Sequence, residues 1–134
     1  VDWLSSLADE AVRAYLGDRR ADPEVARRLR ELWQIRERWK RAVDERKRLT
    51  TEEAQIDKEA RETRLSLRAI EKNRQAADLR ARLTRRLSEL TSRQEQITKQ
   101  LVEVRMAINE QQARFRDAVR GFKVHSTPPP RDRK

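Results

Sequence analysis

The feature that most constrains this fold is a pair of apolar seams whose residues recur alternately three and four positions apart. Such steps average about 3.5 residues, the period that lets one helix lay a continuous stripe against another. The first seam comprises Leu32, Ile35, Trp39, Ala42, Arg46, Leu49, Glu53, Ile56, Ala60, Thr63, Leu67 and Ile70. The second comprises Leu83, Leu87, Leu90, Gln94, Ile97, Leu101, Val104, Ile108, Gln111, Phe115, Ala118 and Phe122. Two seams of nearly equal length predict two long helices that pack along each other.

The composition favours a thin core. Charged residues make up 42% and hydrophobic residues 36% of the 134 residues, which is too polar for a thick globular core but suits helices that each bury one stripe. Disordered chains share this composition, but an unbroken seam favours order because a solvated chain needs no register. No Gly or Pro lies between Pro23 and Gly121, which permits very long helices in a single domain.

A break in phase separates the two seams. Continued, the first seam would place an apolar position at Thr84, whereas the second seam begins at Leu83. A slip of one residue is neither of the insertions, of three or four residues, that coiled coils absorb. We therefore predict a reversal near residues 73–78, with Asn73 in the left-handed conformation and Asp78 as the cap of the next helix. A continuous helix in a long parallel dimer is the alternative.

A short helix is predicted over residues 1–17, ahead of the seams. Its apolar residues recur at helical spacing, with Asp2 as the N-cap and Gly17 as the C-cap. Folding the seams into a hairpin gathers the aromatic residues at one end and brings Trp39 close to Phe115. We expect an all-α fold, in which this short helix packs at the base of a long antiparallel helical hairpin, or coiled coil.

The hairpin is expected to occupy residues 22–123. Asp22 as N-cap followed by Pro23 is a good start signal for a helix. Residues 124–134 are polar and proline-rich, which predicts a disordered tail. Because the chain begins at Val1 rather than at Met, we expect a processed protein or a piece of a larger one. No run approaches the roughly 20 apolar residues of a membrane span, so we expect a soluble protein, either cytoplasmic or envelope-associated.

Polar residues occupy four positions of the seams. Arg46 and Glu53 lie in the first seam, and Gln94 and Gln111 in the second. One interpretation is a gap left for a ligand or a hinge. The favoured interpretation is that polar seam residues fix the alignment of the two helices, with Arg46 extending its charge into water.

The predicted reversal is strongly basic, in a chain whose net charge is +10. A possible interaction patch comprises Arg68, Lys72, Arg74, Arg80, Arg82, Arg85 and Arg86. Such a patch can bind nucleic acid or an anionic membrane, but aromatic residues for base stacking and known nucleic-acid motifs are absent from the sequence. A solvated surface, or one that docks an acidic protein, is favoured. A second basic run, from Arg36 to Arg48, is diluted by acidic residues and is interpreted as a solvated helix face.

The sequence offers no catalytic constellation. It has no cysteine, and its single histidine, His125, lies in the predicted tail without a second histidine to share a metal ion. Gly17 and Gly121 stand alone, which excludes a glycine-rich phosphate loop. We therefore predict no enzymatic activity and no catalytic, cofactor-binding or metal-binding residues.

Three segments carry a resemblance to a known family: DPEVARRLREL at 22–32, ETRLSLRAIEKN at 62–73 and DLRARL at 78–83. They resemble the C-terminal helical hairpin of bacterial proteins known as mucoidy-inhibitor-like, a family whose hairpin accompanies a β-rich domain. The resemblance covers about residues 20–120 and implies a hairpin from a larger, non-enzymatic and envelope-associated protein. It implies no functional residues. Together these observations predict a coiled-coil stalk that spaces or docks partner proteins or self-associates, with nucleic-acid or anionic-membrane binding as the alternative.

Overall fold

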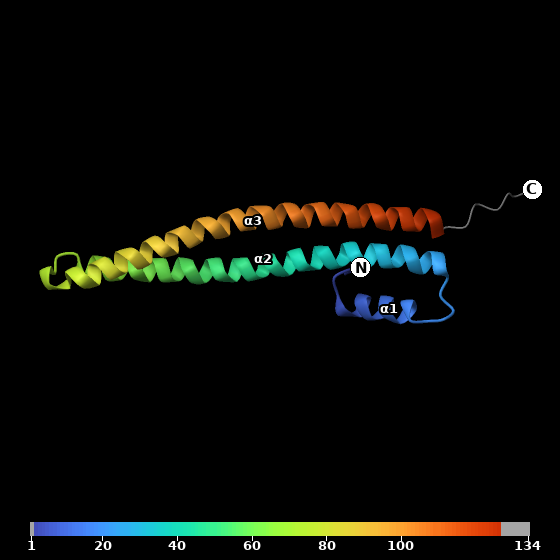
Figure 1. Cartoon of the computed structure of the whole chain (residues 1–134), viewed down its shortest axis with the longest axis horizontal. Coiled ribbons are helices and arrows are strands. Elements are labelled where there is room, and N and C mark those ends of the chain that lie inside the picture. The colour runs from blue at the N-terminus through green and yellow to red at the C-terminus, as the bar shows by residue number, and fades with distance from the viewer. Residues whose placement is uncertain (1, 127–134) are drawn as a thin grey trace, which may run out of the picture. The chain divides into compact units, whose positions relative to one another are not determined.

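The computed structural model describes residues 2–126, and these residues form three α-helices and one short 3₁₀ helix. The elements are α1 (Ser6–Leu16), α2 (Pro23–Ile70), η1 (Arg74–Ala76) and α3 (Ala77–Ser126). Helices α2 and α3 run antiparallel and pack against each other, while α1 lies beside the beginning of α2 (Figure 1). The predicted all-α helical hairpin with a short N-terminal helix at its base is confirmed.

The chain divides into two compact units. The three-helix unit consists of Val1–Val43 and Met106–Lys134, and it contains α1, the beginning of α2 and the end of α3. The turn unit consists of Asp44–Arg105, and it contains the remainder of α2 and α3 with the turn between them.

Ser5, rather than Asp2, caps the N-terminus of α1. The Ser5 backbone is extended, and its Oγ accepts a hydrogen bond of 3.2 Å from the Ala8 amide. The Asp2 carboxylate instead accepts a hydrogen bond of 3.1 Å from the Leu4 amide, which orders the segment before the helix. The predicted Asp2 cap is wrong because Trp3 and Leu4 form a turn, so the helix begins only after Ser5, whose hydroxyl reaches the free Ala8 amide. Gly17 is the C-cap of α1, as predicted.

Helix α2 begins as the sequence predicts. The carboxylate of Asp22 accepts a hydrogen bond of 2.9 Å from the Glu24 amide, which otherwise has no partner in the first turn. At the other end of the chain, α3 continues to Ser126, three residues past the predicted end of the hairpin at residue 123. Residues 127–134, which hold most of the predicted disordered tail, lie outside the described residues.

The core of the turn unit is a single apolar stripe. Its buried members are Leu49, Ile56, Ala60, Leu90 and Ile97, and the partly buried Leu87, Leu101 and Val104 pack against them. All of these are predicted seam positions, and full burial of an apolar side chain stabilises a fold by about 1.5–3 kcal/mol. Along both seams, every position whose side chain is described is buried or partly buried except Arg46, which is exposed.

Polar contacts between the helices fix their alignment in the turn unit. Gln94 Nε2 donates a hydrogen bond of 2.6 Å to Asp57 Oδ1, which supports the register interpretation of this polar seam residue. The preceding residue on α3, Arg93, forms an ion pair of 2.6 Å with Glu52. A shift of one residue would break both contacts and also turn the apolar stripe away from its partner.

Aromatic contacts join all three segments of the three-helix unit. Its buried apolar residues are Ala26, Leu32, Trp33, Ile108 and Phe115. The ring centroids of Trp39 and Phe115 lie 5.4 Å apart, and those of Trp3 and Phe115 also lie 5.4 Å apart. The contact between Trp39 and Phe115 is the one that a hairpin predicts and that a single continuous helix forbids.

Candidate functional site

A pocket opens beside the aromatic cluster of the three-helix unit. Its volume is about 420 Å³, and its lining residues are Trp3, Trp39, Gln112, Phe115, Arg116, Val119 and Arg120. Phe115, which is 2% exposed, forms the floor, while Trp3 and Trp39 are partly buried. The pocket therefore combines three aromatic rings from three separate segments of the chain.

One rim of this pocket is positively charged. Arg116 and Arg120 lie one helical turn apart on α3, and both are exposed. Arg120 has only a long contact of 3.9 Å with Asp117, in which both side chains are 76% exposed. Arg116 forms no ion pair with any residue of the described part of the chain. Since an exposed pair at that distance contributes little, both guanidinium groups are available to a negatively charged ligand.

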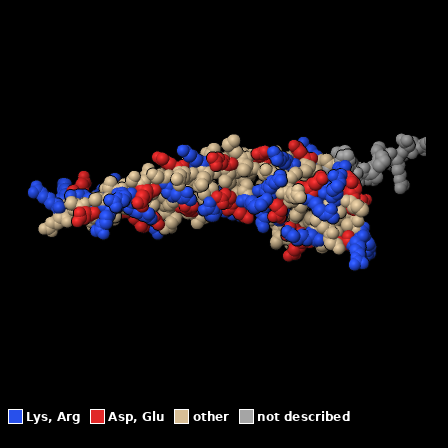
Figure 2. Space-filling model, in the orientation of Figure 1, with Lys and Arg blue, Asp and Glu red and all other residues tan. Residues whose placement is uncertain are grey.

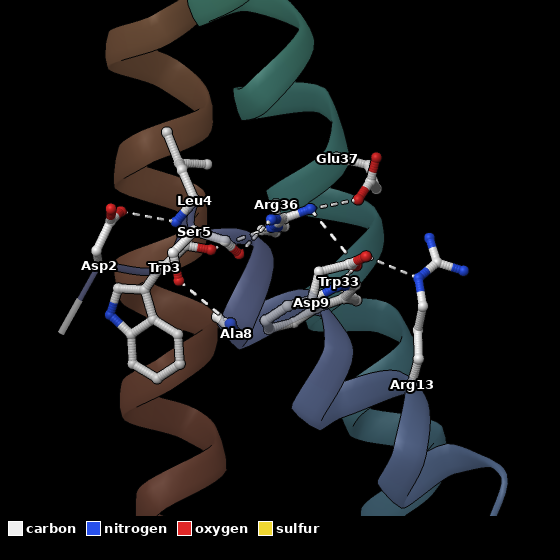
Figure 3. Close-up of polar contacts among 10 residues, drawn as sticks. All are labelled: Asp2, Trp3, Leu4, Ser5, Ala8, Asp9, Arg13, Trp33, Arg36 and Glu37. Carbon is white, nitrogen blue, oxygen red and sulfur yellow. Dashed lines mark hydrogen bonds and ion pairs between the residues drawn. The ribbon is translucent and has the colours of Figure 1, made fainter.

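Arg36 is the most buried charged residue of the three-helix unit, with an exposed fraction of 2%. Figure 3 shows its guanidinium enclosed by α1 and the segment that precedes it. Its Nε donates to the Trp3 carbonyl at 3.1 Å, and its Nη2 donates to the Ser5 carbonyl at 3.2 Å. Because these carbonyls lie next to the start of α1, Arg36 fixes the position of the helix on α2.

Two carboxylates compensate the buried charge. Arg36 Nη1 lies 2.6 Å from Glu37 Oε1 and 3.6 Å from Asp9 Oδ1. The guanidinium carbon also lies 5.1 Å from the centre of the Trp33 ring, a cation–π distance. A buried cation costs several kcal/mol unless it is paired in this way, so Asp9 and Glu37 are what allow Arg36 to be buried.

Asp9 connects α1 to α2 through two partners. The Trp33 indole nitrogen donates a hydrogen bond of 2.9 Å to Asp9 Oδ1, and Arg13 pairs with Oδ2 at 2.8 Å. The Trp33 hydrogen bond, followed by that of Arg13, lowers the pKa of Asp9 below its usual value of 3.8 because both donors favour the charged carboxylate. We call the contacts among Asp9, Trp33, Arg36 and Glu37, together with the hydrogen bonds from Arg36 to the Trp3 and Ser5 carbonyls, the α1 latch (Figure 3).

The interpretation of Arg36 as part of a solvated face is wrong. The sequence places it in a basic run, but α1 packs over this side of α2 and covers it. The position of Trp33 in the sequence could have indicated that Arg36 is buried. This residue lies off the seam, so its burial requires a second packing surface, and Arg36 is three positions away on the same helix face.

Arg80 of the predicted basic patch closes the turn. Its Nη1 donates to the Ile70 carbonyl at 3.2 Å and also to the Asn73 carbonyl. The last carbonyls of a helix lack partners within the helix, and a cationic side chain satisfies them well. Asn73 has an extended backbone rather than the predicted left-handed one, and its side chain accepts from the Gln75 amide at 3.0 Å.

The turn thus contains a cap of a different kind from the predicted one. Asn73 caps η1, and α3 follows directly from Ala77, so Asp78 lies inside the first turn of α3 instead of capping it. The extended Asn73 is favoured because it lets the side chain and the carbonyl of one residue serve η1 and Arg80 at the same time.

Only part of the predicted patch remains free for a ligand. Arg86 pairs with Glu59 at 2.9 Å and with Glu89 at 3.5 Å. The remaining members are exposed and form no ion pair with a described residue: Arg68, Lys72, Arg74, Arg82 and Arg85. Figure 2 shows Lys and Arg side chains at the end that holds the turn, with Asp and Glu side chains among them as elsewhere on this face.

Within residues 2–126, no group of three or more His, Cys, Asp or Glu residues is placed to hold a metal ion. None of the described helices is both long enough and apolar enough to cross a membrane. Neither the known protein families, nor the curated proteins, nor the solved structures contain a match to this chain.

Proposed function

We propose that this chain is a non-enzymatic protein-interaction module, a coiled-coil stalk that spaces or docks partner proteins within a larger protein or assembly. The observation that carries the proposal is large apolar side chains exposed on faces that the seams leave uncovered. Leu7 on α1 is 75% exposed, Leu65 on α2 is 62% exposed and Met106 on α3 is 66% exposed. Helix faces that mix charge with isolated apolar residues suit contact with another protein.

Site-specific photo-crosslinking tests this proposal. A photoreactive benzoylphenylalanine replaces Leu7, Leu65 or Met106 in the chain expressed in its native host. Exposed polar positions on the same three helices serve as matched controls: Glu10, Ser66 and Asn109. The proposal expects protein adducts that form at one or more of the apolar positions and far less at the control on the same helix. Equal yields at apolar and polar positions, or adducts with nucleic acid or lipid alone, contradict it.

The alternative function is the binding of nucleic acid or an anionic membrane by the basic turn. The five exposed, unpaired cations of the turn support it: Arg68, Lys72, Arg74, Arg82 and Arg85. Binding that depends on phosphate contacts falls steeply with salt, by about 10³–10⁵ between 50 and 200 mM for six to ten contacts. Five contacts predict a smaller but clear decrease.

A pair of charge-matched variants tests the alternative. In the first variant, Glu replaces the five turn cations. In the second, Glu replaces five exposed cations of the three-helix unit: Arg19, Arg30, Arg38, Lys40 and Arg41. Both variants change the net charge equally, and fluorescence anisotropy with a labelled DNA duplex and co-sedimentation with anionic vesicles measure their binding. Loss of binding in the first variant alone supports the alternative, whereas equal loss in both assigns the binding to net charge.

The resemblance to the hairpin of mucoidy-inhibitor-like proteins agrees with the same proposal. It covers the two long helices but assigns no residue a role. We therefore propose a bacterial, envelope-associated or cytoplasmic setting for the stalk only as an extension of that resemblance. Crosslinked partners identified in the experiment above would show the setting directly.

A further inference from the structure

We propose that the pocket beside Trp3, Trp39 and Phe115 binds an acidic peptide segment of a partner protein, with an apolar side chain of that segment packed against the three rings. This inference rests on the proposed function and names the chemistry of one partner. In this pocket an open apolar surface meets the exposed positive charge of Arg116 and Arg120.

The size and lining of the pocket select an apolar anchor. Its volume of about 420 Å³ falls within the roughly 300–1,000 Å³ of typical ligand pockets and suits one or two side chains. The Trp3 ring meets Phe115 at 62°, and the Trp39 ring meets it at 49°. Neither Trp ring lies parallel to the Phe115 ring, so the three rings present an angled apolar surface that suits an aliphatic or aromatic side chain such as Leu or Phe.

The rim selects negative charge around that anchor. Arg116 and Arg120 are spaced by one turn on the side of α3 that lines the pocket, so carboxylates on either side of the anchor can reach both. Arginine pairs with carboxylates through two parallel hydrogen bonds, which gives direction as well as attraction. Gln112, also in the lining, adds an amide that can donate to the peptide backbone.

Net charge disfavours this chain as its own ligand. Residues 127–134 carry three basic residues and one acidic residue, so they would place like charge against Arg116 and Arg120. A second copy of the whole chain, with a net charge of +10, is disfavoured for the same reason. The ligand is therefore a segment of a different, acidic protein.

The α1 latch sets one wall of the pocket. Arg36 holds the carbonyl of Trp3 at 3.1 Å, and the Trp3 ring then lies against Phe115. Figure 3 shows the Trp3 ring on the side of α3, away from the guanidinium that anchors its backbone. Arg36 is thus a positioning residue for the pocket and does not line it.

Calorimetric titration with three blocked hexapeptides tests the proposal. The first peptide is Glu-Glu-Leu-Phe-Glu-Glu, the second replaces Leu and Phe by Ala, and the third replaces the four Glu by Gln. We expect the first peptide to bind about tenfold or more tightly than either of the others, because anchor and charge are both required. Equal binding of the Ala peptide, or absence of binding by all three up to about 1 mM, overturns the proposal.

Variants locate the site. Replacing Arg116 and Arg120 by Glu is expected to weaken binding of the first peptide about tenfold. The charge-matched control replaces Arg64 and Arg68 by Glu, at an exposed pair with the same spacing in the turn unit. This control should change binding less than about twofold. Equal weakening in both variants assigns the binding to net charge and overturns the proposal that the peptide binds in the pocket.

The three tryptophans supply an internal control that needs no variant. In a ¹H–¹⁵N spectrum, the indole signals of Trp3 and Trp39 should shift during the titration, whereas that of Trp33, which donates to Asp9, should stay in place. Shifts confined to Trp33 contradict the proposal. Failure of the peptide together with partner crosslinks at Leu7 would reject this pocket and leave the proposed function intact.

Discussion

Arg36 Nε donates a hydrogen bond of 3.1 Å to the carbonyl oxygen of Trp3, which joins α2 to the segment that precedes α1. The contact links stability and recognition within the three-helix unit. It uses a buried charge to hold the short helix, and it places an aromatic ring at the wall of the open pocket. A substitution at Arg36 should therefore change both the stability of the three-helix unit and the binding of a ligand in the pocket.

Replacement of Arg36 by Met tests this link. The substitution keeps much of the side-chain volume but leaves two carbonyls and two carboxylates without their cation. We expect the free energy of unfolding of the three-helix unit to fall by about 2–4 kcal/mol, less than for a fully buried pair because Asp9 and Glu37 are partly exposed. Urea denaturation followed by tryptophan fluorescence measures this unit alone, since all three tryptophans lie in it.

Arg36→Lys provides the control for charge. It keeps the positive charge but loses the planar group that reaches the Trp3 and Ser5 carbonyls together. We expect weakened binding of the acidic peptide in both variants, with a smaller loss of stability for Lys. A stability change of less than about 1 kcal/mol in Arg36→Met would show that the buried guanidinium contributes nothing net.

Asp9 gives the α1 latch a dependence on pH. Its pKa lies below the usual value of 3.8 because the Trp33 indole and then Arg13 donate to the carboxylate. A carboxyl group whose pKa is lowered by folding contributes stability that is complete above its unfolded pKa and is lost as the pH falls through its folded pKa. The melting temperature of the native chain should therefore exceed that of Asp9→Asn at pH 6, and the difference should shrink as the pH falls below about 3.8.

Thermal melts of both proteins between pH 6 and pH 2, followed by tryptophan fluorescence, measure this difference. Glu24, which is exposed at the start of α2, is a useful comparison because hydrogen bonds from Arg27 and then Arg28 lower its pKa to about 2. Its replacement by Gln should change the melt far less, since an exposed ion pair contributes little. A difference between the native chain and Asp9→Asn that stays constant down to pH 2 would contradict the role of Asp9.

Ile97 reports on the seam of the turn unit. It is fully buried among Leu49, Ile56 and Leu90, and truncation of such a side chain to Ala costs about 2–5 kcal/mol. Leu65→Ala, at a side chain 62% exposed on the opposite side of α2 from the seam, should stay within about 0.5 kcal/mol of the native chain. Urea denaturation followed by circular dichroism compares the two, and equal losses would show that the seam is not the stabilising contact.

The seam was predictable because it depends on the helix alone. Once a chain is helical, residues three and four apart share a face, so the sequence identifies Leu49, Ile56 and Ile97 as buried without any knowledge of the partner. The slip between the two seams likewise placed the turn, because a helix that continued would have carried its apolar stripe to the wrong face.

The α1 latch was not predictable in the same way. Whether Arg36 is buried depends on which side of α2 the short helix covers, and that choice is made by contacts between segments remote in the sequence, such as Asp9 with Trp33. The local sequence instead predicted an exposed Arg36, because this residue lies in a basic run. The pocket depends on the same choice, because Trp3, whose carbonyl accepts from Arg36, also packs against Phe115.

Arg80 distinguishes structural from available charge at the turn. Its guanidinium holds the carbonyls of Ile70 and Asn73, whereas Arg82, two positions later, is exposed and makes no ion pair with a described residue. We expect Arg80→Met to destabilise the turn by about 1–2 kcal/mol, the range for hydrogen bonds from a partly exposed charged group, and Arg82→Met to leave it unchanged. Hydrogen exchange of the amides between residues 66 and 73 measures the turn directly. Faster exchange in both variants, or in neither, would show that Arg80 does not hold it.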